Sequence, residues 1–138
     1  MTPQSYVLLT TILLLFPLGY LFLACPAFLL VRLSLPKVPV LLRAMFKGYF
    51  WMLMAVSPLA MLAYTVAEKY GPALGMAVIA VLAIVAHRWF MHSFNTALEA
   101  RDAGDTGGVT RMRRLHVGGM LVNSVVLAVV ILGIPYVV

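Results

Sequence analysis

Residues 6–31 read YVLLTTILLLFPLGYLFLACPAFLLV, and no charged side chain precedes Arg32. A helix needs about 20 mainly apolar residues to cross the hydrocarbon core of a bilayer. Three further apolar stretches of spanning length follow, at about 48–67, 70–95 and 114–138. The sequence therefore predicts an all-α integral membrane protein, a four-helix transmembrane bundle with spans at about 6–31, 48–67, 70–95 and 114–138.

The composition excludes a water-soluble fold. Hydrophobic residues make up 64% of the chain and charged residues 10%, whereas soluble domains carry roughly 25% charged residues. None of the stretches alternates polar and apolar residues as a membrane-spanning strand does, which leaves helices. With no internal repeat or low-complexity tract, residues 1–138 are expected to form a single domain.

The first stretch is expected to remain as a helix. No basic region precedes it, and its apolar run is longer than the roughly 7–15 residues of a signal-peptide core. Pro17 or Pro26 is expected to bend it. The prolines Pro36 and Pro39 predict an extended segment before a helix that starts at Leu41.

Basic residues predict the orientation. Four lie between the first and second stretches, one between the second and third, and five between the third and fourth: Arg32, Lys37, Arg43 and Lys47; Lys69; and Arg88, Arg101, Arg111, Arg113 and Arg114. The positive-inside rule then places the first and third loops in the cytoplasm and both termini outside a plasma (inner) membrane. We interpret the net charge of +6 as a topology signal and a contact with lipid headgroups, and we expect no nucleic-acid partner.

The third stretch divides into two halves. Its first half holds Gly71 and Gly75 in a G-x-x-x-G pattern with several alanines, which favours close helix packing in lipid. Its second half carries a polar stripe at spacings of three and four residues: Arg88, His92, Asn95, Glu99 and Asp102. The stripe is either the wet face of an emerging helix, with Glu99 and Asp102 paired to arginines at 111, 113 or 114, or the wall of a cytoplasm-facing pocket.

The fourth stretch carries His116 and Asn123 on one face. An amide in lipid is costly unless paired, so Asn123 is expected to hydrogen-bond another helix, through Asn95 or a backbone carbonyl. A ligand contact is the alternative role for a polar residue in a span.

The polar residues of these two helices define one candidate cofactor site: Arg88, His92, Asn95, Glu99, His116 and Asn123. Facing imidazoles can ligate haem iron or copper, and an arginine could neutralise a propionate. Which metal, if any, the site takes stays open. The sequence contains no G-x-S-x-G, H-E-x-x-H or phosphate-binding glycine loop, so we expect no classical catalytic set.

Short motifs carry a family resemblance over nearly the whole chain. They are Pro26-Ala-Phe, Gly48-Tyr49-Phe50 after a basic stretch, Asn95 followed by Glu99-Ala-Arg101-Asp102, and Arg114-Leu115-His116 followed by Asn123. With them the chain resembles a family of small uncharacterised four-span membrane proteins, a domain of unknown function near the superfamily of copper-resistance protein D and haem-pathway protoporphyrinogen oxidase. The resemblance implies a left-handed four-helix bundle and a link to haem or copper. A second four-span family, similar to anthrone oxygenases, shares a proline in the first span and an asparagine near the end of the third.

Two functions follow as expectations. The first is a small non-enzymatic membrane subunit or scaffold that packs against other membrane proteins or against itself, because the chain has little mass outside the bilayer and a small-residue face on its third helix. The alternative is a haem- or copper-binding redox or transport protein that uses the polar site.

Overall fold

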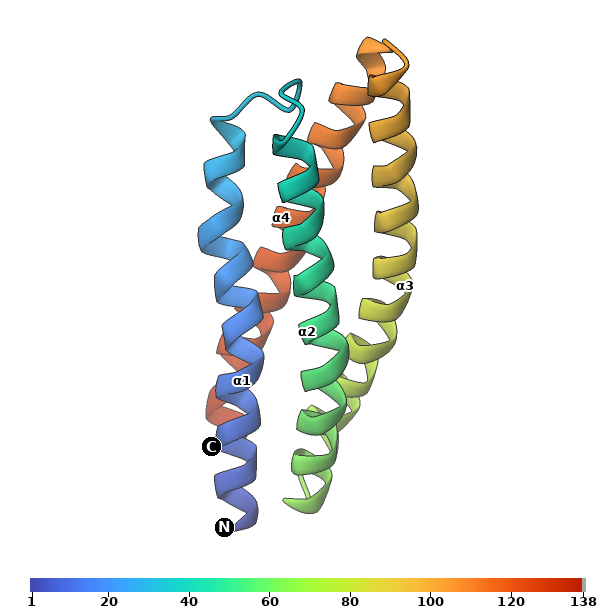
Figure 1. The fold of residues 1–138 in the computed structure, drawn as a ribbon. Coiled ribbons are helices and arrows are strands. Elements are labelled where there is room, and N and C mark those ends of the chain that lie inside the picture. The colour runs from blue at the N-terminus through green and yellow to red at the C-terminus, as the bar shows by residue number, and fades with distance from the viewer. Residues whose placement is uncertain (138) are drawn as a thin grey trace.

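The computed structural model describes residues 1–137, and all regular structure within them is helical. Helix α1 (Pro3–Ala24) continues into a short 3-10 helix, η1 (Cys25–Leu29), and is followed by α2 (Val38–Val66), α3 (Tyr70–Asp102) and α4 (Thr106–Val137) (Figure 1). Four helical segments, the first running through η1, are long and apolar enough to cross a membrane. The chain is therefore an all-helical bundle of multi-pass type.

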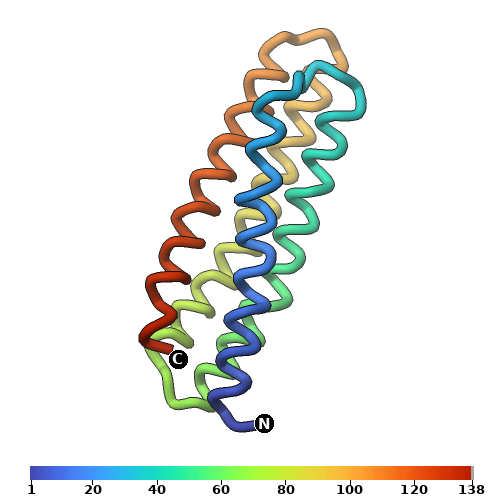
Figure 2. The backbone as a smooth tube through the Cα atoms, turned by 90° about the vertical axis from the view of Figure 1, so that its left-hand side faces the viewer, coloured from blue at the N-terminus to red at the C-terminus, as the bar shows by residue number. Residues whose placement is uncertain are grey.

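The helices run up and down in sequence order. Each packs against its neighbours along the chain, and α4 also packs against α1, which closes the bundle. Both termini and the turn at 67–69 lie at one end, here called the terminal end; the loops at 30–37 and 103–105 lie at the other, here called the basic end (Figure 2). In Figure 1, α4 runs behind α2, from beside α3 at the basic end toward α1 at the terminal end.

Helix starts follow local chemistry. The hydroxyl of Thr2 accepts a hydrogen bond from the backbone N–H of Ser5 and caps α1. Helix α2 begins at Val38, so the expectation of a start at Leu41 is wrong by three residues. Pro39 lies in the first turn, where its missing N–H has no intrahelical partner to lose, so it starts the helix rather than delaying it.

The helices differ in how much of their surface faces the interior. In its most apolar window α1 buries 39% of its residues, whereas α4 buries 11%. The core is formed by α1 and α2 with the inward faces of the other two, and Leu14, Leu18, Phe46 and Phe94 are fully buried in it. Most of α4 therefore faces outward, as lipid-facing helices do.

Exposed aromatic side chains mark two levels of the bundle. Tyr6, Tyr70 and Tyr136 are exposed at the terminal end, and Trp51 and Trp89 are exposed toward the basic end. Tyrosine and tryptophan are enriched where membrane proteins cross the two bilayer surfaces, because one part of each ring system is apolar and another is polar.

The spacing between the two levels matches a bilayer. Tyr70 and Trp89 lie on the same helix, α3. From Tyr70 to Trp89 this helix rises roughly 28 Å at 1.5 Å per residue, close to the hydrocarbon thickness of about 30 Å.

Helices α3 and α4 approach each other closely at the basic end. A Cβ atom added to Gly108 on α4 would lie 2.5 Å from the backbone nitrogen of Arg101 and 2.6 Å from the carbonyl oxygen of Ala97, both on α3. Only glycine fits between these backbones.

We expect Gly108→Ala to destabilise the bundle by about 1–3 kcal/mol, the usual cost of overpacking, because the backbones of α3 and α4 cannot separate without moving the loop between them. Thermal unfolding in detergent measures the effect. Gly48→Ala is the matched control, since no heavy atom lies within 4 Å of its added Cβ; an equal response of the two variants would contradict the assignment.

Candidate functional site

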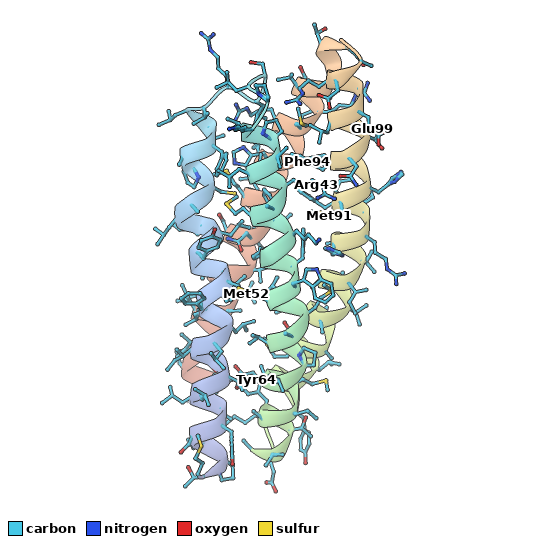
Figure 3. All side chains as sticks on the ribbon, viewed as in Figure 1. Arg43, Met52, Tyr64, Met91, Phe94 and Glu99 are labelled. Atoms are coloured by element: carbon cyan, nitrogen blue, oxygen red, sulfur yellow. The ribbon has the colours of Figure 1, made fainter. Side chains whose placement is uncertain are left out.

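The polar stripe of α3 does not act as one unit. Four of its side chains are exposed: Arg88, His92, Glu99 and Asp102. Asn95 is partly buried, and its Oδ1 accepts a hydrogen bond of 2.6 Å from Nε of Arg43. Arg43 lies between α2 and α3 in Figure 3, so this contact joins the two helices near the basic end. Within the stripe only Asn95 contacts another helix, and the other side chains face outward.

The expected pairing of Asp102 with an arginine of α4 is wrong. Asp102 pairs with its neighbour Arg101, and the other ion pair within residues 1–137 joins Arg111 to Asp105 at 3.1 Å. Both pairs are local in sequence, because the acidic residues lie at the end of α3 and in the following turn, within reach of nearby arginines.

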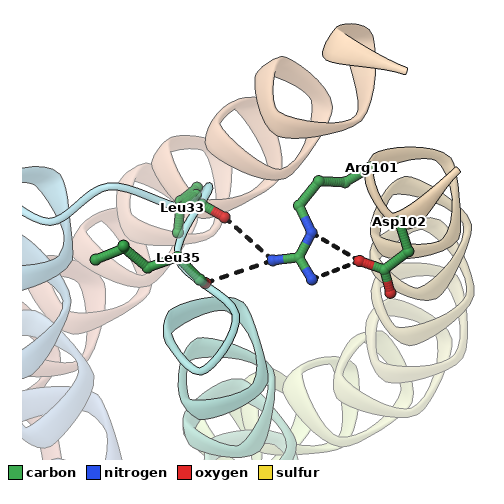
Figure 4. Close-up of polar contacts among 4 residues, drawn as sticks. All are labelled: Leu33, Leu35, Arg101 and Asp102. Atoms are coloured by element: carbon green, nitrogen blue, oxygen red, sulfur yellow. Dashed lines mark hydrogen bonds and ion pairs between the residues drawn. The ribbon is translucent and has the colours of Figure 1, made fainter. Parts of the chain in front are cut away.

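Arg101 also holds the loop between η1 and α2. Its Nη1 lies 3.3 Å from the carbonyl oxygen of Leu33 and 3.5 Å from that of Leu35, while the other side of the guanidinium faces Asp102 (Figure 4). The side chain is only 15% exposed. Arg101 therefore ties the loop at 30–37 to the end of α3.

His116 is fully buried and has hydrogen-bond partners at both ring nitrogens. Its Nε2 lies 2.9 Å from the carbonyl oxygen of Cys25, and its Nδ1 lies 3.4 Å from Nη1 of Arg113. A carbonyl only accepts and a guanidinium only donates, so Nε2 carries the proton and Nδ1 is the acceptor. The ring is neutral and is packed edge-on against Phe28 and Phe46.

Arg113 provides the donors that the end of the first span lacks. Its two terminal nitrogens donate to the carbonyl oxygens of Phe28 and Val31 at 2.6 and 2.8 Å. The last turns of α1 and η1 contain no basic residue, and the cationic partner of the carbonyls at this end comes from another helix. One face of α4 therefore caps the end of the α1–η1 segment through Arg113 and His116.

Asn123 continues this contact deeper in the bundle. Its amide nitrogen donates to the carbonyl oxygen of Leu18 at 3.0 Å, which confirms the expected hydrogen bond to another helix through a backbone carbonyl. Its Oδ1 has no hydrogen-bond partner within the described residues, and neither has the buried Oγ of Ser57 on α2.

The contacts of α1 recur every seven residues. Positions 11 and 18 of α1 and position 25 at the start of η1 bond in turn to Tyr64, Asn123 and His116. Seven residues return a helix to nearly the same face after two turns, so these groups form a line of polar contacts along the inner face of α1. The buried members of the candidate site, His116 and Asn123, belong to this line.

The resemblance to haem- and copper-linked proteins can be tested against the donor set. Coordination of iron or copper needs an imidazole nitrogen with a free lone pair. In His116 one nitrogen donates to Cys25 and the other accepts from Arg113. Residues 1–137 contain no group of three or more His, Cys, Asp or Glu that could hold a metal. His116 therefore has no nitrogen free to ligate a metal, while His92 is exposed, and we derive no chemistry through a cofactor.

An apolar groove lies between α3 and α4 at the terminal end. Its volume is about 720 Å³. Gly71 and Gly75 of α3 and Gly133 of α4 are among its lining residues, and no heavy atom lies within 4 Å of a Cβ added at any of the three. The G-x-x-x-G pattern is therefore not used for packing within this chain.

Comparisons with protein families, with curated proteins and with solved structures find no match for this chain. The family resemblance and the cofactor role of the six residues stay predictions. The sequence interpretation missed the structural roles of Arg43, Arg101 and Arg113. It treated all three as topology signals and Arg113 also as a candidate partner of Glu99 or Asp102. A signal for Arg113 was the end of the first span, whose last turn contains no basic residue.

We expect His116→Ala to raise the reaction rate of the Cys25 thiol with a small methanethiosulfonate reagent by roughly 5–30-fold, equivalent to about 1–2 kcal/mol. The variant removes the hydrogen bond from His116 to the carbonyl oxygen of Cys25 and leaves only Arg113 to cap this end of the first span. The segment that buries the thiol is then held less firmly. Cys25 is the single cysteine, so the reaction reports on one site. Arg114→Ala is the control, because Arg114 is exposed. An unchanged rate in His116→Ala would refute the capping role.

Proposed function

We propose that this protein is a small non-enzymatic membrane subunit or scaffold that packs against transmembrane helices of partner proteins or of a second copy. The observation that carries the proposal is the open space over Gly71 and Gly75. A glycine in a helix interior costs about 1 kcal/mol relative to alanine. Two glycines one turn apart that contact nothing in their own chain are best explained by a backbone that approaches from outside.

The groove has the shape and chemistry of a helix-packing site. One wall is the first three turns of α3, and the other is the last turns of α4. The exposed side chains of Leu74 and Val78 form a ridge beside the glycines. A partner helix can pack against this ridge and against the flat surface that the glycines leave. In lipid, helices associate through close packing rather than through hydrophobic burial, so a small-residue groove is the favourable surface.

The proposal extends to orientation and location. Eight of the ten basic residues of the sequence lie in the loops of the basic end or within ten residues of the helix ends there, Arg88 lies in the middle of α3, and only Lys69 lies at the terminal end. By the positive-inside rule the basic end faces the cytoplasm and both termini face outward, in the plasma (inner) membrane of the cell. The two aromatic levels described above support a bilayer position with Trp51 and Trp89 at the cytoplasmic surface.

Labelling of introduced cysteines tests the orientation. In a Cys25→Ser background we expect Thr106→Cys to react only after the cytoplasmic side is opened and Lys69→Cys to react from outside, because exposed thiols at the two ends lie on opposite sides of the bilayer. An impermeant maleimide applied to intact cells and to inverted vesicles distinguishes them. The reverse pattern would overturn the orientation.

Filling the groove tests the scaffold function. We expect Gly75→Leu to convert the assembly isolated in mild detergent to a monomer, because the added side chain occupies the space that a partner helix needs. Mass measurement of the intact complex reads the outcome and separates a self-assembly from a complex with another subunit. Gly48→Leu is the control, since Gly48 is exposed with equally open space but lies on α2, away from the groove. A parent protein that is already a lone monomer would contradict the proposal.

A further inference from the structure

A separate pocket lies between α2, α3 and α4, nearer the basic end. Its volume is about 230 Å³, and it is lined mainly by aromatic rings of α2 and α3: Phe46, Tyr49, Phe50, Trp89 and Phe90. Trp89 is 63% exposed, so the pocket opens outward, at the level of the tryptophans toward the basic end. A molecule that enters it comes from the bilayer rather than from water.

On the α4 side of the pocket, two glycines, Gly118 and Gly119, leave the helix backbone without side-chain cover. At Gly119 an added Cβ would lie 2.6 Å from the ring of Phe46, so this glycine is required for the ring to pack. At Gly118 no heavy atom lies within 4 Å of an added Cβ. The surface over Gly118 is thus open, and a flexible apolar chain can lie against it between the aromatic rings.

A cation lies at the mouth of this pocket. Arg114 is one helical turn from Gly118 on the same face of α4, toward the basic end, and it is exposed. On α3, Ser93 lies one turn from Trp89, also toward the basic end. Within residues 1–137 Arg114 has no hydrogen-bond or ion-pair partner, whereas the guanidinium of Arg113 is occupied by backbone carbonyls. A free positive charge therefore lies where a lipid headgroup begins.

We propose that this pocket binds one acyl chain of an anionic phospholipid, with the lipid phosphate held by Arg114. The apolar lining suits a hydrocarbon chain, the outward opening admits it from the bilayer, and the unpaired guanidinium selects a headgroup with net negative charge. Basic pockets between transmembrane helices near a membrane surface are a known setting for anionic lipids. This site is independent of the groove at the terminal end.

Tryptophan quenching by brominated lipids tests the proposal directly. The chain has two tryptophans, so Trp51→Phe leaves Trp89 as the only reporter, and it lines the pocket. The protein is reconstituted into phosphatidylcholine vesicles that contain a small fraction of phosphatidylglycerol. Bromine on the acyl chains of one lipid or the other quenches Trp89 when that lipid is bound. We expect brominated phosphatidylglycerol to occupy the site roughly fivefold more than its mole fraction predicts, the preference that one cation near the surface provides.

Matched variants separate a site from general attraction to a basic surface. Arg114→Gln should abolish the preference and Arg114→Lys should keep most of it, whereas Arg32→Gln, which removes an exposed arginine in the loop at 30–37, should leave it unchanged. Gly118→Leu should lower quenching by filling the pocket, while Gly48→Leu should not. The helical circular dichroism of each variant checks that it is folded.

Three results would overturn the proposal. The first is equal quenching by the two brominated lipids in the parent protein. The second is a loss of preference in Arg32→Gln as large as that in Arg114→Gln, which would show a diffuse surface potential. The third is unchanged quenching in folded Gly118→Leu, which would show that the acyl chain does not enter the pocket.

Discussion

The structure depends on hydrogen bonds that α4 donates to the backbone of the first span. The last turns of α1 and η1 contain no basic residue. Donors come from α4, where Arg113, His116 and Asn123 bond to carbonyl oxygens that lie 85, 91 and 105 residues away in the chain. These contacts hold α4 against α1.

The position of α4 has consequences for the outer surface of the bundle. At the basic end α4 touches the backbone of α3 through Gly108, and further along it bonds to α1 through Asn123. Toward the terminal end a groove lies between α3 and α4, with Gly71 and Gly75 open within it. The close contact at Gly108 and the open groove therefore lie at opposite ends of the same pair of helices. The buried polar groups of α4 are used for packing within the chain.

The candidate site shows how far residue patterns could lead. Spacing alone placed His116 and Asn123 on one face of a helix, and the need to pair a buried amide correctly predicted that Asn123 bonds to another helix. Spacing also placed Arg88, His92, Asn95 and Glu99 on one stripe, but it could not say which way the stripe faces. In the structure most of the stripe faces outward and only Asn95 contacts another helix. Helix periodicity fixes which residues share a face, while the rotation of the helix is set by packing against its neighbours.

The sequence by itself determined the helices, because apolar runs of spanning length have one stable form in lipid and because the basic residues are concentrated between particular runs. It also indicated that Asn123 needed a partner. Only the tertiary structure decided that Asn123 bonds to the carbonyl oxygen of Leu18 and His116 to that of Cys25, because every residue carries such a group and no sequence pattern distinguishes one from another. It also decided that the G-x-x-x-G face stays open and that Arg113 is a cap while Arg114, next to it, is free. Adjacent residues on a helix point about 100° apart, so one of two neighbouring arginines can face the interior while the other faces the bilayer surface.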